Sequence, residues 1–398
     1  MKVLISLLGR VQRPGSGSYR TVEYQFDDGT RAEAAFLGWP LARRLKPDRL
    51  LILGTATSMW DHLFEGDLDI ADQAEERRLE LMRLVDADQP VPEALLHSLE
   101  PALADQLGCE VHLSIAPRGL DTSAQMTIFG RLAELINTGD EITLDCTHGF
   151  RHMPMLLLAG AQYLEGVSQA SIDGIYYGLL EPGQSTARVC RLDSLAQIAR
   201  SVRALASFDA SGDYEPLLEV LSPCLPPELR LGELQEAAFH ERTLRIPQAR
   251  KSLQRFYRFL ASSDLPFPHN LLRQPLLERL AWTTEATHDR RQLTAASSAL
   301  SRRDYPRAAA LLYEAVINRI VREDNLGDAE NADVREQARE RLQERLREGK
   351  LPRDLETLRF VRNAMAHGAR PVSAVAQQLL ASETALNRFL ETLIQELT

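Results

Sequence analysis

Three short apolar segments in the first half of the chain constrain its fold most strongly. They have the length of buried strands, and each runs into a glycine or a polar side chain: residues 2–8, 49–54 and 141–145. Amphipathic segments with the period of a helix lie between them, at about residues 71–84, 92–107 and 124–137. Strands that alternate with helices form a mainly parallel sheet covered on both faces. We therefore expect a Rossmann-like α/β domain over residues 1–192.

Shorter segments complete this domain. Asp27, Asp28 and Gly29 separate two strand-like segments, as is typical of a hairpin turn. The patterns predict hairpin arms at 19–25 and 31–36, further strands at 110–115, 171–178 and 186–192, helices at 39–45 and 153–165, and a loop at 13–17.

From about residue 193 the strand patterns end, and helical patterns separated by prolines follow one another. This half predicts an all-α domain over residues 216–398. A helical region at 193–215 is expected to join the two domains. A chain of 398 residues is long enough for both, because domains typically contain about 100–200 residues.

The charge and the cysteines exclude several classes of protein. The net charge of −10 gives no overall positive field, so any nucleotide or RNA binding must be local. No apolar run reaches the roughly 18 residues that cross a bilayer, and we expect a cytoplasmic protein without membrane contact. The cysteines form no C-x-x-C pair, which argues against a zinc site or a disulfide framework and predicts buried free thiols at Cys109, Cys146, Cys190 and Cys224.

Polar residues gather where the apolar segments end, and this edge of a parallel sheet is the one that binds ligands. Glycines allow close approach of the main chain, and hydroxyls and arginines bind phosphate, so an anionic, nucleotide-like ligand fits best. The candidate ligand-binding residues are Gly9, Arg10, Gly54, Thr55, Ser58, Asp145, Thr147, His148, Gly149 and Arg151.

The third of these segment ends also permits other interpretations. Asp145 and Thr147 could cap the helix that follows them instead of contacting a ligand. Asp145, Thr147 and His148 could form a metal or acid/base cluster, but the partners that His148 and His152 would need as metal ligands are not identifiable. Gly9 lacks the other glycines of a G-x-G-x-x-G sequence, so a nicotinamide-dependent oxidoreductase is not expected.

A second group of candidate residues lies near the end of a long helical pattern in the C-terminal half. Arg362 and His367 are five residues apart, which on an ideal helix is roughly 140° and about 7.5 Å. One site can use both if the helix ends there, as Gly368 suggests, or if a second copy of the chain completes the geometry. The alternative is a solvated arginine and a histidine that favours the helix dipole.

These residues resemble two known domains. The strand ends at Leu8-Gly9 and Gly54-Thr55 and the sequence D-x-T-H-G-x-R at residues 145–151 resemble the CARF domain, the CRISPR-associated Rossmann fold. Arg362, Asn363 and His367 match the R-x4-H motif of HEPN ribonucleases. Together the two motifs resemble the CARF–HEPN effectors of type III CRISPR systems, and the resemblance covers essentially the whole chain.

The resemblance implies a homodimer, or a higher oligomer, that binds a cyclic oligoadenylate across its CARF domains and then cleaves single-stranded RNA in antiviral defence. It implies that Gly9, Arg10, Gly54, Thr55, Thr147, His148, Gly149 and Arg151 line the ligand pocket. No cofactor or metal is expected. A pocket on a two-fold axis favours an even ring, and we expect cyclic tetra-adenylate in preference to cyclic hexa-adenylate.

The residues of the R-x4-H motif suit RNA cleavage by the neighbouring 2′-OH. His367 can transfer protons near neutral pH, Arg362 can stabilise charge on the phosphate, and Asn363 can orient either group. Two alternatives remain open at this point. The CARF domain could itself degrade its activator, using Thr147, His148 or Arg151, or the protein could be a ligand sensor whose HEPN domain has lost catalysis.

Overall fold

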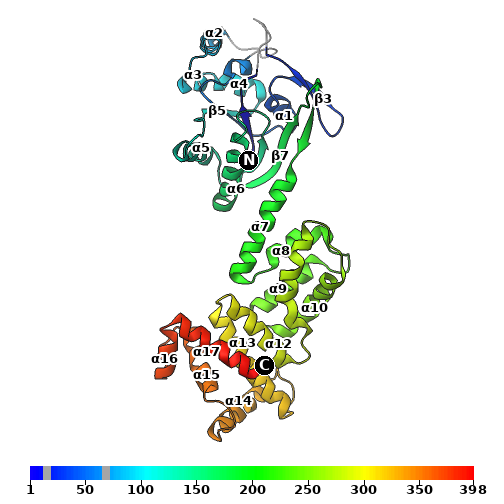
Figure 1. Ribbon diagram of the computed structural model, residues 1–398, viewed down its shortest axis with the longest axis vertical. Helices are drawn as coiled ribbons and strands as arrows, with labels where there is room; N and C mark the ends of the chain where they lie inside the picture. The colour runs from blue at the N-terminus through cyan, green and yellow to red at the C-terminus, as the bar shows by residue number, and fades with distance from the viewer. Residues whose placement is uncertain (12–18, 65–71) are drawn as a thin grey trace. The chain divides into compact units, whose positions relative to one another are not determined.

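The computed structural model describes residues 1–11, 19–64 and 72–398, and these form two compact units, Met1–Ala199 and Arg200–Thr398 (Figure 1). The loop expected at 13–17 and residue 71, the expected start of a helix, lie outside the described residues. The boundary between the units falls within helix α7 (Asp193–Ser211).

An eight-stranded sheet with the order β3-β2-β8-β7-β6-β1-β4-β5 forms the centre of the N-terminal unit. Its strands are β1 (Lys2–Leu8), β2 (Val22–Gln25), β3 (Arg31–Ala34), β4 (Arg49–Gly54), β5 (Glu110–Ile115), β6 (Glu141–Asp145), β7 (Ser171–Leu179) and β8 (Thr186–Arg191). The β2–β3 and β7–β8 pairs are antiparallel and the others are parallel. The predicted mainly parallel sheet and its hairpin are therefore confirmed.

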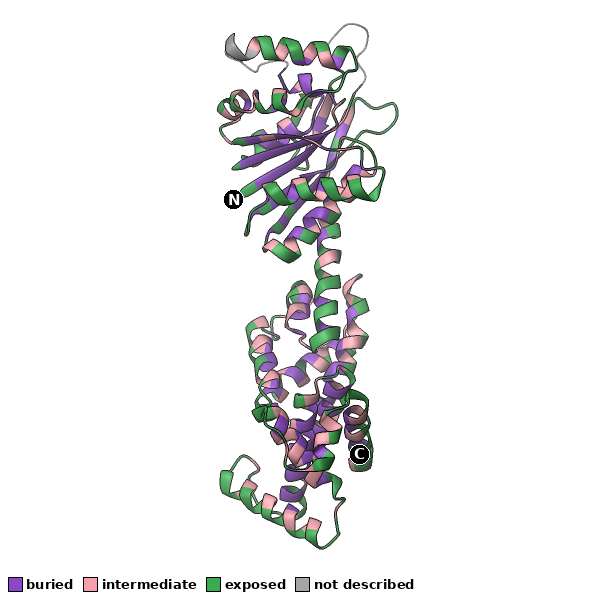
Figure 2. Ribbon diagram, turned by 90° about the vertical axis from the view of Figure 1, so that its left-hand side faces the viewer, coloured by how far each residue is buried: buried purple, intermediate pink, exposed green. Residues whose placement is uncertain are grey.

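The sheet has a separate hydrophobic core on each face, which explains why its central strands are apolar throughout. In β1, Leu4 and Leu8 contribute to one core, and Val3, Ile5 and Leu7 contribute to the other. Figure 2 shows these central strands buried between the helical layers. The helices of this unit are α1 (Gly38–Leu45), η1 (Trp60–Phe64), α2 (Asp72–Asp86), α3 (Glu93–His97), α4 (Glu100–Leu107), α5 (Thr122–Leu135) and α6 (Met153–Ser168).

The single helix expected at 92–107 is wrong, because the segment forms the two helices α3 and α4. Pro101 lies in the first turn of α4. A proline ring clashes with the carbonyl group four residues before it, here that of His97, and so prevents one continuous helix. The same residue is well tolerated in a first turn, where its missing N–H group has no partner to lose.

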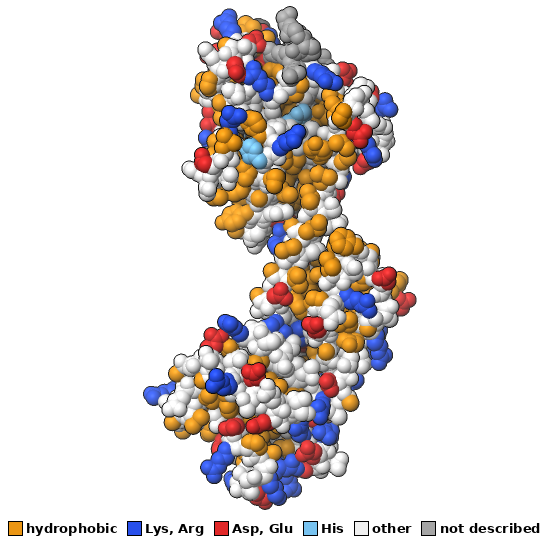
Figure 3. Space-filling model, in the orientation of Figure 1, with side chains coloured by type: hydrophobic (Ala, Val, Ile, Leu, Met, Phe, Trp, Pro, Cys, Tyr) orange, Lys and Arg blue, Asp and Glu red, His pale blue; other side chains and the backbone are white. Residues whose placement is uncertain are grey.

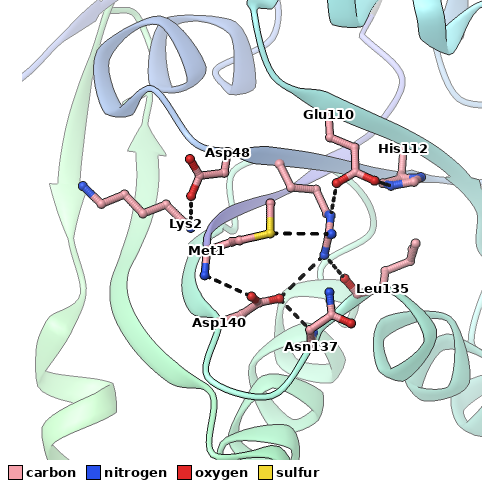
Figure 4. A network of polar contacts seen from close by, with 9 residues as sticks. Met1, Lys2, Asp48, Glu110, His112, Leu135, Asn137 and Asp140 are labelled. Atoms are coloured by element: carbon pink, nitrogen blue, oxygen red, sulfur yellow. Dashed lines mark hydrogen bonds and ion pairs between the residues drawn. The ribbon is translucent and has the colours of Figure 1, made fainter.

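A network of polar contacts holds together the amino ends of the central strands (Figure 4). The guanidinium of Arg49 donates to Glu110 Oε2 at 2.7 Å and to the carbonyl oxygen of Leu135 at 2.9 Å. It also lies 3.6 Å from the buried carboxylate of Asp140, which accepts a hydrogen bond from the N–H group of Asn137. These contacts fix β4, β5 and the start of β6 at one edge, opposite the edge where the candidate ligand-binding residues lie.

Every element of the C-terminal unit, which the structure describes in full, is helical, and the predicted all-α domain is confirmed. Its central helix is α13, which packs against α12, α14, α15 and α17. Beyond α7 the helices are α8 (Glu215–Leu221), η2 (Ser222–Cys224), α9 (Leu231–Arg242), α10 (Ile246–Ser262), η3 (His269–Leu272), α11 (Arg273–Leu280), η4 (Ala281–Thr284), α12 (His288–Ser301), α13 (Tyr305–Glu323), α14 (Ala332–Arg347), α15 (Asp354–His367), α16 (Ala374–Leu380) and α17 (Glu383–Leu397).

Two further expectations concern the whole chain. None of the helices in the described residues is long and apolar enough to cross a membrane. The four cysteines are free thiols, but only Cys146 is buried, while Cys109, Cys190 and Cys224 are half-buried.

Candidate functional site

A cavity of about 270 Å³ lies at the carboxyl ends of β1 and β4. Six of the expected ligand-binding residues line it, namely Gly9, Arg10, Gly54, Thr55, Ser58 and Gly149. The lining also includes residues that the sequence analysis did not identify: Leu7, Leu8, Leu53, Thr57, Phe150 and Met153. Of these, Phe150 could have been recognised, because it is an aromatic residue in a polar loop directly after a strand.

Glycines bring two segments of main chain together at the cavity wall. A Cβ atom on Gly9 would lie 2.7 Å from the backbone nitrogen of Gly149. Gly149 itself has a φ of +89°, a conformation that side chains other than glycine rarely adopt. The loop after β6 can therefore approach the loop after β1 only because both positions lack a side chain.

Ser58 connects the ends of the two strands. Its Oγ donates to the carbonyl oxygen of Leu8 at 2.8 Å and accepts from the N–H group of Thr55 at 2.9 Å. The indole N–H of Trp60 donates to the carbonyl oxygen of Thr55 at 2.8 Å. These bonds give the cavity a defined wall, and they occupy the Ser58 hydroxyl that was expected to face a ligand.

Asp145 and Thr147 are turned into the protein, and neither belongs to the lining formed by the described residues. The buried carboxylate of Asp145 accepts from the Ser6 hydroxyl and, at 3.0 Å, from the N–H group of Thr147. The Thr147 hydroxyl accepts from the N–H group of Gly178 on β7 at 2.9 Å. The alternative that they cap the next helix is wrong, because α6 begins after His152.

His148 does not belong to the cavity lining of the described residues and is held by Leu37 and Tyr24. Its Nε2 accepts from the N–H group of Leu37 at 3.2 Å and lies 3.4 Å from the Tyr24 hydroxyl. Burial lowers the pKa of His148, and the nearby carboxylate of Asp145 opposes this shift. Because Nε2 is an acceptor, the neutral ring carries its proton on Nδ1. No group of three or more His, Cys, Asp and Glu side chains in the described residues is arranged to hold a metal ion.

The two arginines expected at the pocket differ in position. Arg10 lines the cavity, and its guanidinium forms an exposed ion pair with Asp88. Arg151 is exposed and does not belong to the cavity lining of the described residues.

An arginine from another loop reaches the cavity region instead. The guanidinium of Arg118 lies 4.9 Å above the ring of Phe150, which stacks on His152 with ring centres 5.9 Å apart. Phe150 lines the first cavity, and Arg118 lines a second hollow of about 670 Å³, which shares Thr55 and Thr57 with the first.

In the C-terminal unit, the motif residues lie at the end of α15. The guanidinium of Arg362 lies 4.5 Å from the ring centre of Tyr313, and its Nη1 donates to Asn363 Oδ1 at 2.8 Å. His367 is exposed and is the last residue of the helix, which Gly368 ends with a φ of +62°. The helix therefore ends where the sequence predicts, and a charged group and a histidine lie near its free end.

Comparison with known proteins identifies the N-terminal unit. Residues 3–179 match the family model described as CRISPR system endoribonuclease Csx1, CARF domain. This unit is a CARF domain. The resemblance of the strand ends and of the D-x-T-H-G-x-R segment to the CARF domain is therefore confirmed for residues 3–179.

One known protein is similar to part of the chain in sequence, and one solved structure aligns with nearly all of it. The CRISPR-associated protein MJ1674 of Methanocaldococcus jannaschii is 28% identical over 238 residues, which are 54% of this chain and only 37% of that protein. The structure of Enterococcus italicus Csm6 bound to cyclic hexa-2′-fluoro-hexa-dAMP matches over 99% of this chain and 93% of its own, with 13% identity and a TM-score of 0.39.

Within the CARF domain, the D-x-T-H-G-x-R segment thus has two structural roles. Asp145, Thr147 and His148 hold the loop against neighbouring strands, whereas Gly149 contributes its main chain to the cavity. The rest of the polar part of the cavity lining comes from the ends of β1 and β4, at Gly9 and Thr55.

Proposed function

We propose that the protein is a metal-independent endoribonuclease of the HEPN type, which cleaves single-stranded RNA when a cyclic oligoadenylate binds to its CARF domain. The observation that supports the proposal is that Arg362, Asn363 and His367 all lie in the last six residues of α15, in a chain that also contains a CARF domain with a cavity. The all-α fold of the second unit fits a HEPN domain.

The activator would bind at the cavity formed by the strand ends. Close approach of Gly9 and Gly149 leaves main chain exposed to a ligand, and Arg10 at the rim can pair with phosphate. A cavity of about 270 Å³ is at the small end even for one drug-sized ligand, so a ring of four or six nucleotides must extend beyond this cavity. We propose that the ring is shared between two copies, and the two-fold symmetry of such a site is the reason to prefer cyclic tetra-adenylate as the activator.

An exposed apolar stripe supports the homodimer. Met155, Tyr163 and Val167 lie along α6 and are 71%, 68% and 60% exposed. The start of α6 borders the cavity through Met153, so two copies paired along this helix would bring their cavities together. Figure 3 shows hydrophobic side chains among charged ones on the visible face of this unit.

The chemistry would be attack of a ribose 2′-OH on the neighbouring phosphorus, with departure of the 5′-oxygen. His367 would accept the proton of the 2′-OH or donate a proton to the leaving oxygen. Arg362 would stabilise the charge that develops on the phosphate oxygens. Because Asn363 accepts a hydrogen bond from Arg362, its role is to orient that guanidinium. We propose that two copies of this helix end form one composite site across the dimer axis.

The structure does not favour degradation of the activator by Thr147 or His148. Both side chains are engaged by main-chain N–H groups away from the cavity lining of the described residues, Thr147 by Gly178 and His148 by Leu37. Cleavage of cyclic oligoadenylate into linear products by the purified protein would contradict this interpretation if it is lost in Thr147→Ala or His148→Ala, and would point to Arg151 if it is lost only in Arg151→Ala.

The test is cleavage of a labelled mixed-sequence RNA by the purified protein, alone and with cyclic tetra- or hexa-adenylate, with and without a chelator. We expect cleavage with cyclic tetra-adenylate that the chelator does not prevent. Cleavage that is equally fast without any activator would contradict allosteric control. Absence of cleavage with every activator would favour a catalytically silent sensor.

A mixing experiment tests the composite site. Heterodimers of wild-type chains with His367→Ala chains should lose far more than half of the activity if each site uses both copies. Full activity for each remaining histidine would contradict a shared site.

A further inference from the structure

Tyr313 lies directly beneath the arginine of the R-x4-H motif. Its ring centre is 4.5 Å from Cζ of Arg362, and only 4% of the tyrosine surface is exposed. The residue comes from α13, the central helix of the unit, whose neighbouring residues Leu312 and Val316 are also buried. The ring therefore belongs to the rigid core, while the guanidinium above it is half-buried and can reach a ligand.

A ring in this position restricts a side chain that is otherwise flexible. Guanidinium groups stack on aromatic faces through their planar shape and their charge, and lysine cannot reproduce this stacking. Asn363 holds the same guanidinium from its edge through the 2.8 Å hydrogen bond. Arg362 is thus fixed by a face contact and an edge contact, and Nη2 and Nε remain for other partners.

We propose that Tyr313 is a positioning residue of the ribonuclease site, which acts by holding the guanidinium of Arg362 in the orientation that binds the scissile phosphate. This inference rests on the proposed function. The tyrosine is far from the motif in sequence and outside the residues matched by the CARF family. Its role follows from the packing of α15 on α13.

The same helix offers a matched control. One turn before Arg362, the guanidinium of Arg359 lies 4.9 Å from the ring centre of Phe360 and 3.7 Å from a carboxylate oxygen of Glu356. Phe360→Leu therefore removes an arginine–aromatic contact of similar geometry from an arginine outside the motif. Any loss caused merely by weakening a ring contact on α15 would appear in this variant too.

The experiment measures kcat and KM for RNA cleavage with activator present. We expect Tyr313→Leu to lower kcat about tenfold, since cation–π contacts contribute on the order of the free energy that changes a rate tenfold. Tyr313→Phe keeps the ring and should stay within about threefold of the wild type. Phe360→Leu should leave kcat unchanged. In an Arg362→Lys background, Tyr313→Leu should cause no further loss, because the ammonium does not stack in the same way.

Three results would overturn the inference: a Tyr313→Leu protein as active as the wild type, an equal loss in Phe360→Leu, or an undiminished loss in the Arg362→Lys background.

A second measurement does not depend on activity. The Nε–Hε resonance of Arg362 in protein with ¹⁵N-labelled arginine should carry a ring-current shift that disappears in Tyr313→Leu and persists in Tyr313→Phe. A wild-type protein that cleaves no RNA would refute the proposed function, and the positioning role with it, while this resonance would still show whether the ring holds the guanidinium.

Discussion

The two candidate sites use their polar residues in opposite ways. In the CARF domain, the side chains of Asp145, Thr147 and His148 point into the protein and bond to neighbouring strands and loops. The cavity there is formed largely by main chain and apolar groups. In the C-terminal unit, His367 is the exposed last residue of α15, and Arg362, five residues before it, is half-buried.

The difference follows from the two kinds of secondary structure. A loop that leaves a buried parallel strand carries main-chain N–H groups that need partners, and nearby polar side chains provide them. A helix satisfies its own main-chain groups except the first four N–H and the last four C=O groups, so the side chain of Arg362, which precedes the last turn of α15, is not needed to satisfy the main chain. Polar residues of a motif can therefore hold a loop in place, as in the CARF domain, or serve as candidate reactive groups, as in the C-terminal unit.

The largest effect is expected at the end of α15. Arg362→Ala or His367→Ala should lower RNA cleavage by about 10²–10⁴-fold, the range for loss of a group that transfers protons or stabilises transition-state charge. Binding of the activator, measured by calorimetry, should not change, because the CARF cavity is intact. Arg388→Ala, at an exposed position of the same unit, is the control. Unchanged cleavage in either motif variant would remove these residues from the reaction.

A glycine substitution tests whether main-chain approach forms the CARF cavity. In Gly9→Ala, the new Cβ would lie 2.7 Å from the nitrogen of Gly149, and overpacking of this kind costs about 1–3 kcal/mol. We expect a lower free energy of unfolding and at least tenfold weaker binding of cyclic oligoadenylate.

Gly130→Ala provides the matched control, since a Cβ at this position in α5 meets nothing within 4 Å. It should stabilise the protein by about 0.5–1 kcal/mol, as alanine does within helices, and leave binding unchanged. Equal binding by both variants would mean that close approach at Gly9 is unnecessary.

The hydrogen bond that the neutral ring of His148 accepts from Leu37 predicts that the stability of the protein depends on pH. Burial lowers its pKa in the folded protein below the value near 6.5 of the unfolded chain. As the pH falls below about 6.5, the unfolded chain binds a proton that the folded one does not, and the free energy of unfolding decreases by up to about 1.4 kcal/mol per pH unit.

The contribution of neutral His148 to the free energy of unfolding is fully present above pH 6.5. Denaturant unfolding at pH 7.5 and 5.5 should show a smaller decrease in His148→Gln, in which the side-chain carbonyl can still accept from Leu37. The same decrease in both proteins would assign the pH dependence to other groups.

The smallest effect is expected at the cavity rim. Arg10 and Asp88 form an exposed ion pair, and such pairs contribute about 0–1 kcal/mol. Asp88→Asn should therefore leave the midpoint of thermal unfolding almost unchanged. It should also release Arg10 for phosphate and raise activator affinity a few-fold, most clearly at low salt. Weaker binding in this variant would show that the ion pair positions Arg10 for the ligand.

Much of the fold could be predicted from the sequence because it depends on neighbours along the chain. The apolar segments predicted the central strands, the Asp-Gly turn predicted the β2–β3 hairpin, and Gly368 predicted the end of α15. The break between α3 and α4 was also encoded locally, at Pro101, but the period of apolar residues across it concealed the signal.

The tertiary structure alone decided how the candidate polar side chains are arranged. Ser58 lines the cavity and bonds to Leu8, whereas Thr147 and His148 lie outside the lining and bond to Gly178 and Leu37, which are far from them in the sequence. In the same way, Tyr313 lies under Arg362 only because α15 packs on α13. The period of a strand or helix follows from local geometry, whereas the partner of a side chain depends on which distant segments pack against it. This is why the sequence indicated candidate residues for both sites without showing how their side chains are arranged.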